Sequence, residues 1–157
     1  MGTCNSNSKG NSASGNSGVE QRNAALVQAE RARASMVRAA ESYASKLNER
    51  ASKWALPDEP IELATSAQKE AYRSLKNGEK PSNLGRIPSK NLNQIKMKLR
   101  QEYKSNTEGL SQNTYEPDGR LFKAYQGRVE DISKGLEHVE SAINQKLKNY
   151  GKKKGIK

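Results

Sequence analysis

Apolar residues recur every three or four positions along most of this chain, which is the spacing of one face of an α-helix. The pattern is clearest over residues 120–150, where the alternating spacing forms an a/d heptad seam. The seam consists of Phe122, Tyr125, Val129, Ile132, Leu136, Val139 and Ile143. Gly127 and Gly135 weaken this helix, which indicates either close approach of another helix or weak selection for stability. We predict a helix over 120–150 that packs through the seam.

A second stripe runs over residues 19–56, without an internal glycine or proline. It is mostly alanine, which favours helix but buries little apolar area, so this helix needs a partner with larger residues. The Leu56-Pro57 step ends it, because a residue before proline avoids the helical region. The stripe comprises Leu26, Ala29, Ala32, Met36, Ala40, Tyr43, Leu47, Ala51 and Trp54.

A short helix is predicted over residues 66–77. Thr65 and Gln68 have the spacing of a capping box, and Asn77-Gly78 is typical of a helix end. The following stretch, 78–88, contains two glycines and two prolines and is expected to be irregular.

Another helix is predicted over residues 89–105, with Ser89 as its cap. One face of it is apolar, and lysines with one arginine cover the other. The apolar face comprises Leu92, Ile95, Leu99 and Tyr103. We expect a loop over 106–119, because it ends in the turn sequence Pro117-Asp118-Gly119.

The predicted fold is therefore all-α. Residues 1–18, rich in Asn, Ser and Gly, are expected to be a flexible, disordered tail. Residues 19–150 form one helical domain, followed by a basic tail over 151–157. Two arrangements fit: a long helical hairpin with 120–150 packed on 19–56, or a small helical bundle.

Positive charge narrows the choice of partner. The chain has 28 Lys and Arg against 17 Asp and Glu, a net charge of +11, and only 32% hydrophobic residues. Such a balance favours an acidic partner, which can be a protein, a nucleic acid or an anionic membrane surface. The candidate binding residues are Lys90, Lys96, Lys98, Arg100, Lys104, Lys152, Lys153 and Lys154. The seam over 120–150 also allows a homo-oligomer.

The first residues fit a lipidation pattern. Gly2 with Ser6 matches N-myristoylation, and the neighbouring Cys4 is placed to take a palmitate. The chain is expected to be intracellular and cytoplasmic, and peripheral on a membrane only if Gly2 is myristoylated. We expect no transmembrane helix, because no apolar run is long enough, and no Sec signal, because the N-terminus lacks a hydrophobic region.

No arrangement of residues predicts catalysis. His138 is the only histidine and is expected to be a solvated residue beside the seam. The single cysteine excludes an internal disulfide and a cysteine-based zinc site. HExxH, a phosphate-binding glycine loop and a dinucleotide fingerprint are absent. We therefore predict no catalytic residues, metal site or cofactor.

The stretch ATSAQKEAYR at residues 64–73, followed by the lysine-rich helix at 90–104, resembles segments near the ends of bacterial polymorphic toxins and phage head-morphogenesis proteins. The resemblance implies a bacterial or phage origin and assigns no functional residue. The predicted function is a non-enzymatic helical interaction or structural protein that uses a basic surface and the heptad-like seam. The alternatives are a small electrostatic nucleic-acid-binding protein, and a basic bacterial or phage effector or toxin domain.

Overall fold

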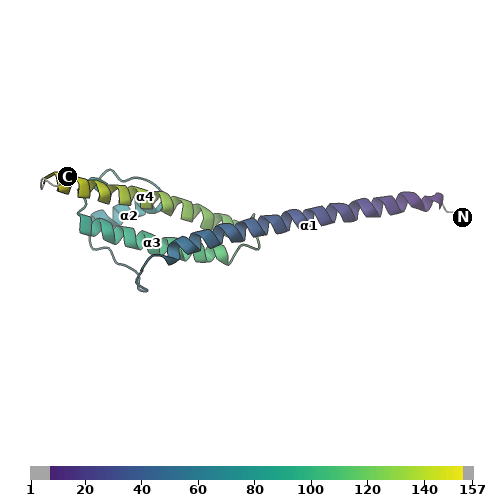
Figure 1. Cartoon of the computed structure of the whole chain (residues 1–157), viewed down its shortest axis with the longest axis horizontal. Helices are drawn as coiled ribbons and strands as arrows, with labels where there is room; N and C mark the ends of the chain where they lie inside the picture. Colours follow the sequence, from purple (N-terminus) through teal and green to yellow (C-terminus); the bar gives the residue numbers. More distant parts are fainter. Residues whose placement is uncertain (1–7, 154–157) are drawn as a thin grey trace. The chain divides into compact units, whose positions relative to one another are not determined.

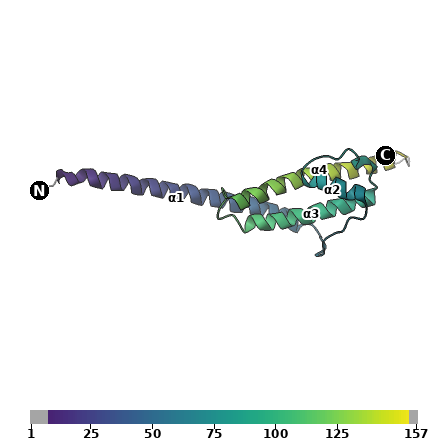
Figure 2. The same ribbon diagram turned by 180° about the vertical axis from the view of Figure 1, so that it is seen from behind.

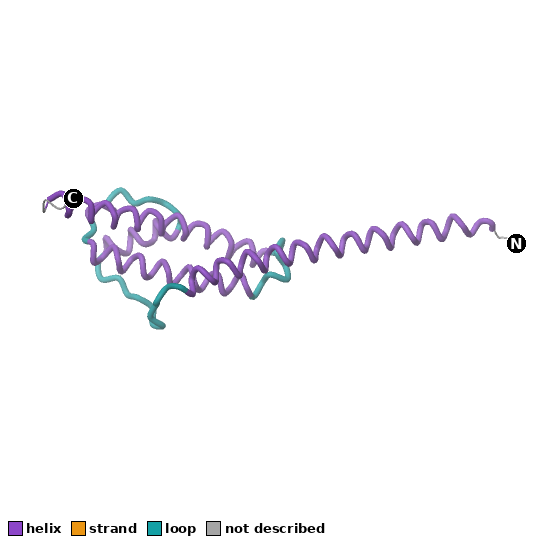
Figure 3. The backbone as a smooth tube through the Cα atoms, in the orientation of Figure 1, coloured by secondary structure: helices purple, strands orange, loops and turns teal. Residues whose placement is uncertain are grey.

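The computed structural model describes the backbone of residues 8–153 and the side chains of residues 18–152. Over these residues the chain forms four α-helices and one short 3₁₀ helix, without a strand (Figures 1 and 3). The helices are α1 (Ser8–Ser52), α2 (Ser66–Lys76), η1 (Leu84–Arg86), α3 (Ser89–Ser111) and α4 (Arg120–Lys153). The predicted all-α class is confirmed.

The chain divides into two units after Ala39. The first unit contains α1 up to that residue, and Leu26 and Met36 of the predicted stripe are 61% and 44% exposed there. The helix begins at Ser8, inside the predicted tail, whereas residues 1–7 lie outside the described part of the chain. The predicted alanine-rich stripe is therefore not buried over its first half.

In the second unit, α4 packs along α3 and against α2 (Figures 1 and 2). The last turns of α1 add Ala40, Ala44 and Ala51 to the same core. The seam of α4 is buried or half-buried at all seven positions. The architecture is thus a small helical bundle and not a hairpin of two long helices, because α2 and α3 supply large side chains to the seam of α4.

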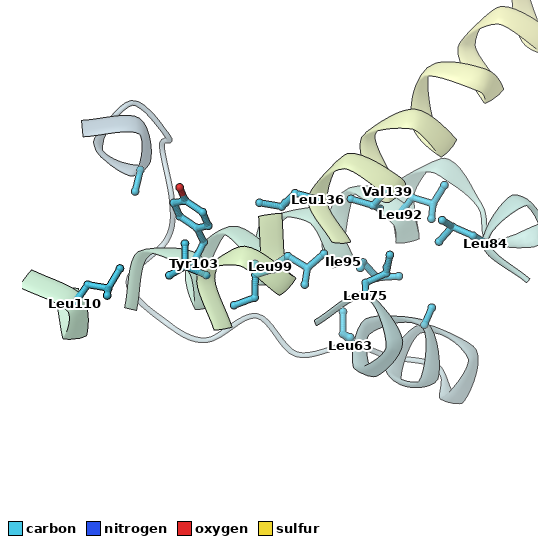
Figure 4. Packing of buried hydrophobic residues seen from close by; sticks show 14 of the residues in the cluster. Leu63, Leu75, Leu84, Leu92, Ile95, Leu99, Tyr103, Leu110, Leu136 and Val139 are labelled. Atoms are coloured by element: carbon cyan, nitrogen blue, oxygen red, sulfur yellow. The ribbon is translucent and has the colours of Figure 1, made fainter. Parts of the chain in front are cut away.

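Large aliphatic side chains from three helices make up the centre of this core (Figure 4). Leu75 comes from α2, Leu92 and Leu99 come from α3, and Leu136 comes from α4, and all four are fully buried. Full burial of one such side chain contributes about 1.5–3 kcal/mol to folding. The core therefore holds α2, α3 and α4 to one another.

Helix α3 extends to Ser111, into the stretch that was predicted to be a loop. Leu110 is fully buried, and Gly109 lets α4 approach so closely that a Cβ atom there would lie 2.5 Å from the Tyr125 ring. The Asn106 amide also donates to the Glu102 carbonyl oxygen at 2.7 Å. Packing against α4 thus outweighs the weak helix preference of the Asn, Thr, Gly and Ser residues in this stretch.

Local signals define the ends of α2 as predicted. Thr65 and Gln68 form a reciprocal capping box. At the other end, Gly78 has a φ of +81°, and its N–H donates to the Leu75 carbonyl oxygen at 3.0 Å. Helix α1 ends at Ser52, slightly before its predicted end.

Candidate anion-binding surface

A cavity of about 510 Å³ opens between α2, α3 and the segment that precedes α2. Four cationic side chains and one carboxylate line it, together with one aliphatic and one aromatic side chain. We call it the basic cavity, and its lining residues are Glu62, Leu63, Lys69, Tyr72, Arg73, Lys76 and Lys98.

The three cations of α2 share one face of that helix. Lys69, Arg73 and Lys76 are separated by four and three residues, the spacing that aligns side chains along a helix. The buried residues of α2, among them Gln68 and Leu75, lie on another face and hold the helix in the core. Core packing therefore directs these three side chains to the cavity.

Two side chains of α3 hold the segment before α2 in place. The Gln101 amide nitrogen donates to the carbonyl oxygen of Glu59 at 2.8 Å, and its amide oxygen accepts from the N–H of Ile61 at 3.1 Å. Lys98 donates from Nζ to the Ile61 carbonyl oxygen at 2.7 Å. These bonds fix the wall of the cavity that carries Glu62.

The buried Gln68 side chain ties α2 to α3. Its oxygen accepts from the backbone N–H of Ala64 at 3.1 Å and of Thr65 at 3.0 Å, and its nitrogen donates to the Gln94 side-chain oxygen at 2.8 Å. Because both ends of the carboxamide are bonded, the position of α2 relative to α3 is fixed at this point. The cations of α2 are thereby held near Lys98 of α3.

Two ammonium groups of the cavity lie over the ring of Tyr72. The ring centroid is 5.5 Å from Lys98 Nζ and 6.0 Å from Lys76 Nζ, within the range of cation–π interactions. Burial raises the pKa of the Tyr72 phenol well above its ordinary value, and the nearby Glu102 carboxylate raises the pKa further. The phenol is therefore neutral near pH 7 and does not offset the positive charge.

Carboxylates neutralise the basic cavity only in part. Glu102 lies 3.6 Å from Lys76, and both side chains are partly exposed. Lys69 and Arg73 are exposed and form no ion pair with the described residues. Like charges at this helical spacing disfavour a helix slightly, so an anion bound here would relieve repulsion within α2.

A neighbouring cavity of about 390 Å³ has a different character. Its charged lining residues are two lysines and three carboxylates, so it lacks an excess of positive charge. They are Lys98, Lys104, Asp58, Glu102 and Glu108. Lys98 belongs to both cavities, so acidic side chains border the basic cavity on this side.

The basic residues predicted on α3 do not share one set of neighbours. Lys90 and Lys104 are exposed, and Lys96 is half-buried. Lys98 lines the basic cavity, whereas the Arg100 guanidinium lies 4.8 Å from the centre of the Trp54 ring, just after the end of α1. The structure therefore brings Lys98 together with cations of α2 and leaves Arg100 in a separate aromatic contact.

Sequence reasoning missed the three cations of α2. The signal was present as basic residues four and three positions apart on a helix of correctly predicted limits. What the sequence lacks is any sign that Lys98, more than 20 residues away from them, faces the same cavity.

Several other predicted residues lie at the margins of the structure. Gly2, Cys4 and Lys154 are outside the described residues. Lys152 is exposed at the end of α4, and the side chain of Lys153 is outside the described part. The predicted lipidation and the contribution of the basic tail stay predictions.

His138 is half-buried and lines a third cavity, of about 330 Å³, with Lys80 and Lys146. Lys146 donates there to the Gly85 carbonyl oxygen at 2.9 Å.

Within residues 18–152, no group of three or more His, Cys, Asp or Glu side chains is arranged to hold a metal ion. None of the described helices combines the length and hydrophobicity needed to cross a bilayer.

The predicted seam faces the interior of the bundle. Phe122, Val129, Ile132, Leu136 and Val139 are buried, and the two remaining seam residues are half-buried. The basic cavity is therefore a better candidate for a binding surface than the seam.

No protein-family model, curated protein or solved structure matches the chain. Its function is therefore inferred from its own residues and their geometry.

Proposed function

We propose that this protein is a non-enzymatic helical binding protein that holds an acidic segment of a partner protein at the basic cavity. The observation that carries the proposal is the convergence of four cations on one cavity that contains a single carboxylate. Two of the four, Lys69 and Arg73, are exposed and have no ion-pair partner among the described residues. Hydrogen bonds between such cations and carboxylates or phosphates are among the stronger polar contacts.

The surroundings favour a short acidic segment over a continuous nucleic-acid backbone. Asp58 and Glu108 line the adjoining cavity and would repel a phosphate chain that continued past Lys98. Two ammonium groups lie over the half-buried Tyr72 ring, so it offers no open ring on which bases stack. A few acidic side chains of a protein can instead reach the cavity without crossing these carboxylates.

Nucleic-acid binding is the second candidate, and the net charge of +11 together with the exposed Lys90 and Lys104 favours it. In that case the affinity for duplex DNA should fall with salt, with a log–log slope of about −0.9 for each phosphate neutralised. Changing Lys96 and Lys98 to glutamine should reduce that slope and weaken all sequences alike. Binding that is absent at both low and physiological salt would exclude this candidate.

A pair of charge reversals tests the proposal. Lys69→Glu with Arg73→Glu should weaken binding of a labelled Asp/Glu-rich peptide by about tenfold or more, because two cations of the cavity become repulsive. The matched control is Lys123→Glu with Lys134→Glu, which changes the net charge equally at exposed positions of α4. Fluorescence anisotropy at low and physiological salt measures both pairs.

The two pairs separate a defined site from general attraction to positive charge. Loss of peptide binding in the α2 pair alone supports the basic cavity. An equal loss in both pairs would show that net charge, and not the cavity, holds the peptide. Absence of peptide binding by the unmodified protein at low salt would overturn the proposal.

A further inference from the structure

We infer that the basic cavity recognises a phosphate monoester, so that its preferred group on an acidic segment is a phosphorylated side chain. This inference rests on the proposed function of the cavity and adds the chemistry of the group that binds there. A phosphorylated side chain and a free organic phosphate have the same group in common, a compact dianion with three terminal oxygens attached to an organic body.

Charge matching selects a dianion over a single carboxylate. Four cations and Glu62 line the cavity, and Glu102 lies 3.6 Å from Lys76, so two positive charges remain in excess. A phosphate monoester carries about 1.5 to 2 negative charges at pH 7, whereas one carboxylate carries a single charge. A bound phosphate monoester therefore neutralises the excess, and one Asp or Glu side chain leaves part of it.

The donors also fit a phosphate. Arg73 presents a planar fork of N–H groups that can bond two phosphate oxygens at once. Lys69, one helical turn earlier, presents a mobile ammonium group. Lys98 is already oriented by its bond to the Ile61 carbonyl and by the Tyr72 ring. Three cations from two helices can thus surround a group with three terminal oxygens.

The remaining lining suits the organic part of such an ester. Leu63 is buried and Tyr72 half-buried, and both contribute to the cavity wall beside the cations. The cavity volume of about 510 Å³ falls in the range of about 300–1,000 Å³ that is usual for ligand sites. A phosphate with an attached side chain or small aromatic group is therefore accommodated with its charged end toward α2.

A pair of small probes tests the preference for a dianion. Phenyl phosphate and phenyl sulfate have nearly the same shape, but the sulfate carries only one negative charge. We expect phenyl phosphate to bind at least about tenfold more tightly, the factor that one charge-assisted hydrogen bond contributes. Amide chemical-shift changes should concentrate on residues 62–76 and on Lys98 and its neighbours. Equal binding of the two probes, or shifts elsewhere on the protein, would overturn the inference.

Two substitutions by glutamine identify the side chains that donate hydrogen bonds to the phosphate. Arg73→Gln and Lys69→Gln should each reduce the affinity for phenyl phosphate by about tenfold, while Lys134→Gln on α4 should leave it unchanged. The first two side chains have no ion-pair partner among the described residues, so the unfolding midpoint should not change. Unchanged affinity in both variants would contradict the assignment of the phosphate to this cavity.

Two peptides distinguish a phosphorylated partner segment from a free organic phosphate. They also separate the proposed binding of an acidic segment from the inferred preference for phosphate. A phosphoserine peptide that binds at least about tenfold better than its Glu-substituted form supports a phosphorylated partner segment. Equal binding of the two peptides refutes the inference and leaves the acidic-segment function in place. Binding of phenyl phosphate without binding of either peptide supports a free organic phosphate as the ligand and refutes the protein-partner function.

Discussion

Gly135 lies where α4 meets the end of α2, and its replacement by alanine tests that contact directly. A Cβ atom at this position would lie 2.0 Å from the carbonyl oxygen of Leu75 and 2.7 Å from its carbonyl carbon. Both are backbone atoms of α2, so no side-chain rotation can relieve the overlap. Relief requires α2 to move away from α4, which disturbs a core that is packed at nearly crystalline density.

The expected magnitude combines two opposing effects. Inserting a methyl group into a packed site costs about 1–3 kcal/mol, and the upper end applies here because the Leu75 carbonyl also accepts the N–H of Gly78 at the end of α2. Replacing glycine by alanine inside a helix contributes about 1 kcal/mol in the other direction. We therefore expect Gly135→Ala to lower the free energy of unfolding by about 2 kcal/mol, or the midpoint by about 4–8 °C.

The same helix provides the control. Apart from its chain neighbours and the backbone of its own helix, no atom lies within 4 Å of the position of a Cβ atom on Gly127, so alanine there has the helical benefit without the overlap. Gly127→Ala should raise the midpoint by about 2–4 °C. Fluorescence of Trp54, the only tryptophan, reports on the core during thermal unfolding because its ring packs 5.1 Å from that of the buried Tyr103. If both variants were stabilised alike, α2 would not contact α4 as the structure has it.

Three further predictions concern the core and its tyrosines. Leu136 is fully buried, so Leu136→Ala should lower the free energy of unfolding by about 2–5 kcal/mol in chemical denaturation. Leu26→Ala, at an exposed position, should change it by less than about 0.5 kcal/mol, and similar losses in both variants would contradict the observed burial. The buried Tyr103 hydroxyl makes no hydrogen bond with the described residues, so Tyr103→Phe should keep or raise the thermal midpoint, and a marked decrease would reveal an unrecognised partner. Burial raises the pKa values of Tyr72 and Tyr43, so the folded state resists their ionisation, and stability present below about pH 10 should be lost as the pH rises above it. Urea midpoints from about pH 8 to pH 11 should therefore fall less steeply when both tyrosines are replaced by phenylalanine, and an unchanged profile would contradict the assignment.

Structural features that depend on a single helix could be predicted from the sequence. The seam residues of α4, from Phe122 to Ile143, share one helical face, because a stripe that repeats every three to four residues necessarily does so. This face is buried or half-buried at every seam position. The limits of α2 followed from Thr65, Gln68 and Gly78, whose bonds involve only neighbouring residues. These features depend on backbone geometry that a helix has wherever it lies in the fold.

Contacts between helices required the tertiary structure. Of two similar glycines in α4, a Cβ atom added to Gly135 would overlap α2 and one added to Gly127 would meet open space, a difference that local sequence does not contain. Residues 106–111 remain helical because α4 packs against them, although Asn106, Thr107, Gly109 and Ser111 have weak helix preferences. The alanine stripe of α1 is buried only from Ala40 onwards, where it belongs to the core of the second unit, because periodicity indicates which residues share a face and not whether that face is buried.

The basic cavity shows the same division. Sequence alone determined the excess of positive charge and the helical spacing of Lys69, Arg73 and Lys76. Only the packing of α2 on α3 decided that Lys98 joins these three side chains while Arg100 contacts Trp54. The physical reason is that charge and periodicity are properties of a segment, whereas a cavity forms where two buried faces position the exposed flanks of different helices around a common space.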